Sequence, residues 1–163
     1  MARREVRSFD YVNHPYESVR AALEADARQV FAAATRAAAE RAGSVASELR
    51  VDIGGLRVAA EVAINVVRIE EDAPGPASSR VTRIHLQWEA AHRPGLFPLM
   101  DAELSVYPLT STETQLDFAG RYDPPLGALG DALDAVVGHR IAEASVHRFL
   151  ADVAQHLRET LKA

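Results

Sequence analysis

Between Arg80 and Tyr122 the sequence alternates between apolar and polar residues in three successive stretches, 80–90, 100–107 and 114–122. In a strand, a period of two places alternate side chains on opposite faces, so one face is buried and the other contacts water. Short polar or proline-containing segments separate the stretches. Consecutive strands joined by short connections predict an antiparallel meander, and this is the strongest constraint on the fold.

The segment before the meander predicts a strand followed by two short helices. Residues 4–12 alternate and stop just before Pro15, which suits the first turn of a helix. Asp26 can cap a second helix, and Gly43 is expected to end it.

A period of two returns after the second expected helix. Leu49, Val51 and Ile53 alternate up to the dipeptide Gly54-Gly55, and residues 56–66 continue the alternation. Paired glycines tolerate the positive φ of a tight turn. We therefore expect a hairpin here, with a loop at 72–79 before the meander.

The last segment is helical in pattern. Apolar residues recur at spacings of three and four from Leu129 to Leu161, which predicts one long helix with a bend near Gly138. No repeat or linker divides the chain, so residues 1–163 are expected to form a single α+β domain. Its antiparallel sheet would curve around the C-terminal helix.

Composition and charge exclude several classes of function. A formal net charge of −5 argues against a nucleic-acid binder, and the absence of cysteine excludes disulfides and thiolate chemistry. No apolar run reaches the roughly 18 residues that a membrane-spanning helix needs, and the N-terminus does not read as a signal peptide. We expect a cytoplasmic protein that neither inserts into a membrane nor holds a cofactor.

The order of elements resembles the helix-grip fold of the SRPBCC superfamily, which includes START domains and polyketide cyclases. The motifs that carry the resemblance are Trp88, Phe97-Pro98, Thr114-x-Leu116 and the segment Gly120-Arg121-Tyr122-Asp123-Pro124-Pro125-Leu126-Gly127, followed by a long helix. They are similar to those of bacterial members whose activity is not established. The resemblance covers nearly the whole chain in element order and about forty residues in motif.

This resemblance implies an apolar cavity between the concave face of the sheet and the C-terminal helix. Pockets of this kind are mostly apolar, with a few polar groups that orient the ligand. The expected lining residues are Val62, Ile64, Leu86, Trp88, Met100, Leu104, Leu116, Phe118, Tyr122, Leu133, Val137 and Ile141. The same pattern is also compatible with a core that these side chains fill completely.

Few polar residues are candidates for ligand binding, metal binding or catalysis. His139-Arg140 interrupts the apolar helix, and the forked donors of Arg140 would suit an anion at the cavity mouth, although a surface pair is the better account. Asp152 and His156 share a helix face without a third ligand, so no metal site is expected. The sequence contains no nucleophile elbow, and no residue is assigned a catalytic role.

Three functions remain open at this point. The first is a binder of a small hydrophobic molecule, and the sequence favours it over an enzyme. The second is an enzyme similar to polyketide cyclases and aromatases, and the third is a protein-interaction module with a filled core. A homodimer through the smooth, alanine-rich side of the second helix, or through a sheet edge, is compatible with all three.

Overall fold

A computed structural model of the chain describes residues 4–53, 62–71, 80–90, 100–122 and 131–161. Five strands and two helices follow one another in these ranges. They are β1 (Arg4–Val12), α1 (Tyr16–Ile53), β2 (Val62–Glu71), β3 (Thr82–Ala90), β4 (Met100–Pro108), β5 (Thr114–Tyr122) and α2 (Asp131–Thr160).

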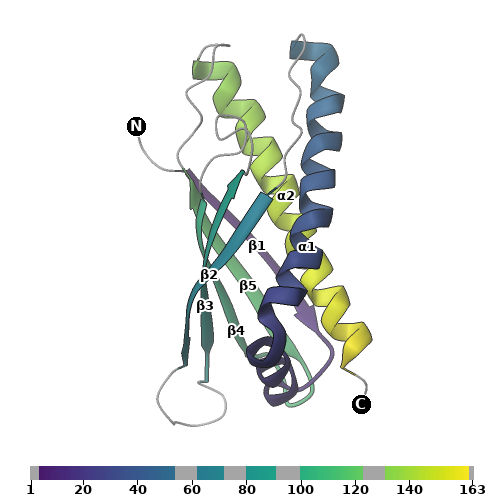
Figure 1. Cartoon of the computed structure of the whole chain (residues 1–163), viewed down its shortest axis with the longest axis vertical. Helices are drawn as coiled ribbons and strands as arrows, with labels where there is room; N and C mark the ends of the chain where they lie inside the picture. The colour runs from purple at the N-terminus through teal and green to yellow at the C-terminus, as the bar shows by residue number, and fades with distance from the viewer. Residues whose placement is uncertain (1–3, 54–61, 72–79, 91–99, 123–130, 162–163) are drawn as a thin grey trace.

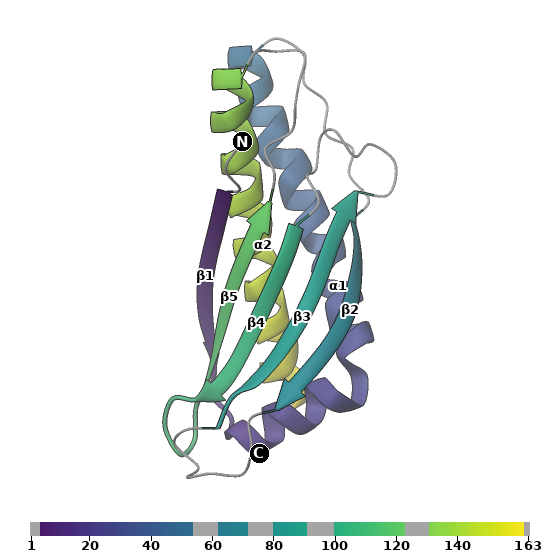
Figure 2. The same cartoon turned by 90° about the vertical axis from the view of Figure 1, so that its left-hand side faces the viewer.

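The strands form one antiparallel sheet in the order β1-β5-β4-β3-β2. The predicted meander is therefore confirmed for β3, β4 and β5, and β1 pairs beside β5 at one edge. Both helices cover the same face of the curved sheet, which we call the inner face (Figure 1). Figure 2 looks onto the opposite, outer face, and there the upper ends of both helices project beyond the strands. The predicted helix-grip architecture is confirmed.

The two expected helical segments are joined into α1. Asp26 has non-helical backbone angles (φ −151°, ψ 40°), and this kink separates a short first arm from a long second arm. The first arm crosses the lower end of the sheet, whereas the second runs alongside α2 (Figure 2). The expected second helix start at Asp26 thus corresponds to the kink.

The expected end of that helix at Gly43 is wrong, and so is the expected strand at 49–53, because α1 continues to Ile53. A glycine inside a helix costs only about 1 kcal/mol relative to alanine. The alanine-rich segment before it has high helix propensity, and extending an existing helix adds one hydrogen bond per residue fixed. Three alternating residues are too weak a signal against that extension. The expected turn at Gly54-Gly55 lies outside the described residues.

The core lies between the inner face and the helices, with Phe149 of α2 at its centre. The Phe149 ring lies 5.6 Å from that of Phe31 on α1, 5.4 Å from that of Trp88 on β3 and 5.9 Å from that of Phe118 on β5. All four rings are fully buried. Tilted and edge-on aromatic contacts of this length add stability beyond the buried area, so these rings tie both helices to the sheet.

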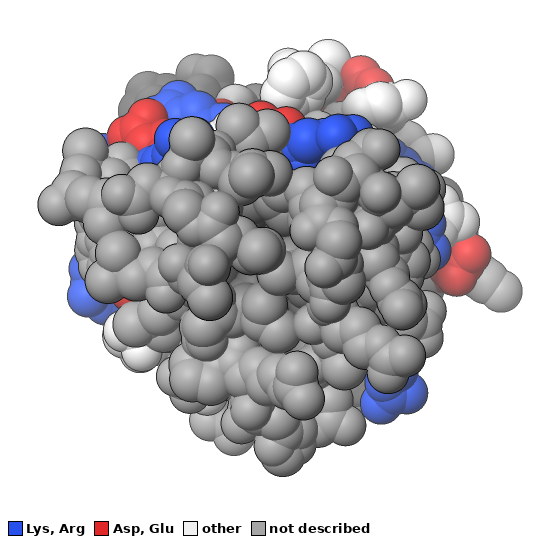
Figure 3. Space-filling view, turned by 90° about the horizontal axis from the view of Figure 1, so that it is seen from above, with Lys and Arg blue, Asp and Glu red and all other residues white. Residues whose placement is uncertain are grey.

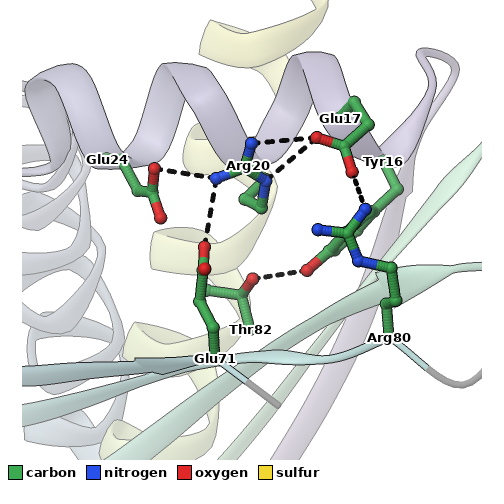
Figure 4. A network of polar contacts seen from close by, with 7 residues as sticks. All are labelled: Tyr16, Glu17, Arg20, Glu24, Glu71, Arg80 and Thr82. Atoms are coloured by element: carbon green, nitrogen blue, oxygen red, sulfur yellow. Dashed lines mark hydrogen bonds and ion pairs between the residues drawn. The ribbon is translucent and has the colours of Figure 1, made fainter. Parts of the chain in front are cut away.

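A charged network attaches the first arm of α1 to the lower end of the sheet (Figure 4). The Arg20 guanidinium contacts the carboxylates of Glu17 and Glu24 at 2.9 Å each, and that of Glu71 at the end of β2 at 3.1 Å. One cation therefore connects three carboxylates from two elements.

A second set of contacts lies beside this network. The buried Tyr16 hydroxyl is 2.6 Å from Thr82 Oγ1, which joins the start of α1 to the start of β3. Arg80 pairs with Glu17 and lies over the Tyr16 ring, with its guanidinium carbon 5.3 Å from the ring centre. These contacts fix the direction in which α1 leaves the sheet (Figure 4).

Replacing Arg20 with Met is expected to weaken the dependence of stability on acid pH. The hydrogen bond from Arg20 lowers the pKa of Glu17. A hydrogen bond shared with Glu24, which raises the pKa of Glu24, and then one from Arg20 lower the pKa of Glu71. A carboxylate whose pKa is lowered in the folded state stabilises the protein at pH values above the ordinary pKa of 4.5. This stabilisation is lost as the pH falls through the lowered pKa. The wild type should thus lose more stability than Arg20→Met between about pH 7 and about pH 3.

Urea denaturation across this pH range measures the effect. Arg36→Met is the matched control, because Arg36 is an exposed arginine on the same helix. Equal acid sensitivity of the wild type and Arg20→Met would contradict the assigned role of the network.

Candidate functional site

The upper end of the inner face carries a row of side chains that crosses the whole sheet. Strand register pairs Ile64 with Trp88, Trp88 with Met100, Met100 with Tyr122, and Tyr122 with Arg4. Trp88 and Met100 have no exposed surface and Tyr122 is 1% exposed. The row occupies the end of the sheet where β3 and β5 finish and β4 begins.

The next row down contains small residues where the upper row is large. Ala102 pairs with Gly120 in the centre of the sheet. A Cβ atom placed on Gly120 would lie 2.6 Å from Met100 Sδ and 2.9 Å from Phe118 Cε1, so the Met100 side chain lies directly against the glycine backbone. Glycine is needed here because of this close approach, and it sets the position of Met100 in the upper row.

Tyr122 brings a hydroxyl of the buried central row into contact with α2. Its hydroxyl lies 3.0 Å from Nδ1 of His139, and the two rings are stacked with centres 6.3 Å apart. Nε2 of His139 lies 2.7 Å from Glu143 Oε1, one helical turn further along α2. A hydroxyl, an imidazole and a carboxylate therefore form a continuous chain that begins in the buried row and ends at the exposed Glu143.

The environment of Tyr122 keeps its hydroxyl protonated. Burial raises the pKa of Tyr122, the positive charge of Arg4 partly opposes this increase, and the negative charge of Glu143 adds to it. A phenol with a raised pKa is neutral at physiological pH. Tyr122 can consequently act as a hydrogen-bonding group there without carrying charge.

The structure places the expected cavity residues on the inner face wherever it describes their side chains. Ile64 is half-buried at the upper end and pairs with Trp88, in the row that continues through Met100 to Tyr122. Further down, the inner face carries buried side chains that belong to the core around Phe149, namely Leu86, Leu104, Leu116 and Phe118. The side chains of the remaining candidates, Val62, Leu133, Val137 and Ile141, lie outside the described residues.

Arg140 is exposed on α2, whereas its neighbour His139 contacts Tyr122. The polar pair singled out from the sequence is thus split, and the histidine is the member that reaches the buried row. Sequence reasoning missed the contact with Tyr122 and the role of Glu143. The available signal was the spacing of four between His139 and Glu143, which places both on one helix face.

The outer face of the sheet carries a hollow of about 460 Å³. Its walls are charged, and the small Ala119 lies between Arg7 and Glu103 in the strand register. Glu5 pairs with Arg121 at 3.1 Å, and Glu103 with Arg83 at 3.4 Å. Acidic and basic groups on this face largely pair with one another, as in an ordinary solvated sheet face.

Within the described ranges, no cluster of three or more His, Asp or Glu side chains is arranged to hold a metal ion. Neither described helix is long and apolar enough to cross a membrane. Figure 3 looks down on the upper end of the molecule, where the acidic and basic side chains in view are interspersed around the edge.

Comparison with known proteins extends the description of the fold. No protein-family model matches the sequence, and no curated protein matches it. Among solved structures, the Zhui aromatase/cyclase from Streptomyces sp. R1128 aligns with a TM-score of 0.52 at 14% identity, covering 99% of this chain and 98% of that one. A START superfamily protein from Mycobacterium smegmatis aligns with a TM-score of 0.46 at 10% identity, covering 98% and 100%. The alignment with the Zhui aromatase/cyclase shows a shared fold, in agreement with the helix-grip architecture expected from the sequence.

Proposed function

We propose that the protein binds a small hydrophobic molecule between the sheet and α2, at the upper end of the sheet where Tyr122 meets His139. The observation that carries this proposal is the buried row of Trp88, Met100 and Tyr122, which is mostly apolar and includes the Tyr122 hydroxyl. Ligand pockets combine a mostly apolar lining with a few placed polar groups. Further down the inner face, the Phe149 ring packs against that of Phe118, and it also contacts Trp88 of the row.

The Zhui aromatase/cyclase, which shares this fold, is named as an enzyme. The arrangement of the helices supports the proposed location. Both helices of the present protein project beyond the sheet at its upper end, so the helix faces there extend past the described strands (Figure 2). A ligand at this end would contact the sheet row from one side and α2 from the other.

A second function, catalysis by an aromatase- or cyclase-like enzyme, is favoured by one observation. The chain from Tyr122 through His139 to Glu143 has the order of a hydroxyl, a base and an orienting carboxylate. Such an arrangement can move a proton to or from a bound molecule. Mass analysis of a probe after incubation with the protein separates the two functions, because a binder returns the probe unchanged.

Replacing Met100 with Phe is expected to weaken binding of 2-naphthol at least about tenfold, which corresponds to ~1.4 kcal/mol. The larger ring would occupy space between Trp88 and Tyr122 in the upper row. Isothermal titration calorimetry measures the change. Leu109→Phe is the matched control, because Leu109 is 51% exposed in the turn after β4.

Circular dichroism and thermal denaturation must show that Met100→Phe is folded before the affinities are compared. A folded Met100→Phe protein that binds 2-naphthol as tightly as the wild type would place the ligand elsewhere. The location proposed here would then be wrong.

A further inference from the structure

We infer that the Tyr122 hydroxyl is the polar recognition point of this site, and that His139 sets it to accept a hydrogen bond from the ligand. The preferred ligand is then an apolar molecule that carries an O–H donor, such as a phenol or an enol. This inference rests on the proposed function and adds to it the chemical class of the ligand.

The donors and acceptors of the Tyr122, His139 and Glu143 side chains determine which role the Tyr122 hydroxyl can play. A neutral imidazole has one N–H donor and one acceptor nitrogen, and a carboxylate only accepts. The 2.7 Å contact with Glu143 therefore requires the proton of His139 on Nε2. Nδ1 is then the acceptor, and the Tyr122 hydroxyl donates to it over 3.0 Å. Since that hydroxyl has only one proton, its oxygen presents lone pairs alone to a ligand.

Protonation of His139 removes this preference. Both ring nitrogens of an imidazolium donate, so Nδ1–H would donate to the Tyr122 oxygen and the contact with Glu143 would remain. The hydroxyl proton would then be free to turn toward the ligand. A ligand that only accepts, such as an ether or a carbonyl, would gain a hydrogen bond that it lacks when His139 is neutral.

The charged groups around the hydrogen-bonded side chains of Tyr122, His139 and Glu143 lie on two elements, β1 and α2. Arg4 on β1 pairs with Tyr122 across the sheet, and its positive charge acts on the hydroxyl. On α2 the neighbours are Glu143, which contacts His139, and the exposed Arg140. β3 and β4 contribute only Trp88 and Met100 to this row. Among the α1 side chains that the structure describes, none places a charged group against His139.

Two probes of similar shape test the hydrogen-bond preference. 2-Naphthol can donate through its hydroxyl, whereas 2-methoxynaphthalene can only accept. We expect the wild type to prefer 2-naphthol by about tenfold near pH 7.5, the size of one net hydrogen bond. The preference should fall to about threefold or less in acidic buffer, about pH 5, once both ring nitrogens of His139 carry a proton.

Variants assign the effect to named residues. Tyr122→Phe should bind both probes equally at both pH values. His139→Gln should show a preference that does not change with pH, because glutamine does not titrate. His147→Gln is the matched control and should behave like the wild type, since His147 is an exposed histidine of the same helix whose Nδ1 lies 3.3 Å from Ser8 Oγ.

The ligand-free protein provides an independent readout. Nitrogen-15 NMR of the histidine rings should show the His139 proton on Nε2 near pH 7.5, and a proton on Nδ1 would overturn the inference. If both probes bind equally at both pH values, the inference fails while the proposed function stands. If neither probe binds the wild type at either pH, the proposed function fails and the inference fails with it.

Discussion

Replacing Phe149 with Ala is expected to lower the free energy of unfolding by about 3–5 kcal/mol. The Phe149 ring is fully buried and contacts the rings of Phe31, Trp88 and Phe118, which come from α1, β3 and β5. Its loss would leave a cavity at the point where both helices meet the sheet. For a chain of this size the melting temperature should fall by about 6–20 °C, as measured by circular dichroism or calorimetry.

Phe9→Ala is the matched control, because Phe9 is 73% exposed on the outer face of β1. Surface substitutions away from special contacts change stability by about 0.5 kcal/mol or less. If both phenylalanine variants lost the same stability, Phe149 would not be the centre of the core.

Replacing Gly120 with Ala is expected to destabilise the fold by about 1–3 kcal/mol. The new methyl group would lie 2.6 Å from Met100 Sδ and 2.9 Å from Phe118 Cε1. The flexible Met100 side chain can move away, but the Phe118 ring is held against Phe149. The movement of Met100 would also disturb the upper row, so 2-naphthol binding should weaken in parallel.

Ala119→Val separates this clash from a general intolerance of β5 to substitution. Ala119 is the neighbouring residue, exposed on the outer face, and a β-branched residue suits a strand there. Chemical denaturation of both variants measures the difference. A Gly120→Ala protein as stable as the wild type would show that the close approach of Met100 is not a constraint.

The sequence predicted those parts of the fold in which one local signal acts without competition. In β3, β4 and β5 the alternation runs for about nine residues, and each of these strands has one buried and one solvated face. The kink at Asp26 was also visible, as a helix start. Local pattern and tertiary packing agree in these elements, which is why they were predictable.

The segment around Ile53 was not predictable from the same kind of signal. Its short alternation competes with a helix that is already formed and that packs along α2, and α1 extends through it. A three-residue pattern does not distinguish a strand from the end of such a helix. The error therefore arises from tertiary context and not from the individual residues.

The candidate site was predictable in its apolar part only. Inward-facing residues such as Trp88 and Met100 follow from the alternation of their strands. The contact between Tyr122 and His139 depends on how far α2 lies along β5, and no spacing in the sequence encodes that position. The choice of His139 over Arg140 as the inward residue likewise depends on the rotation of the helix.

Native mass spectrometry of protein purified gently from the cells that produce it tests the central claim most directly. We predict an additional discrete mass of a small hydrophobic molecule, which disappears on denaturation and is reduced in folded Met100→Phe protein. A bare chain mass from the wild type, together with no binding of 2-naphthol by calorimetry, would contradict the account. The upper end of the inner face would then be part of a filled core, as expected for an interaction module.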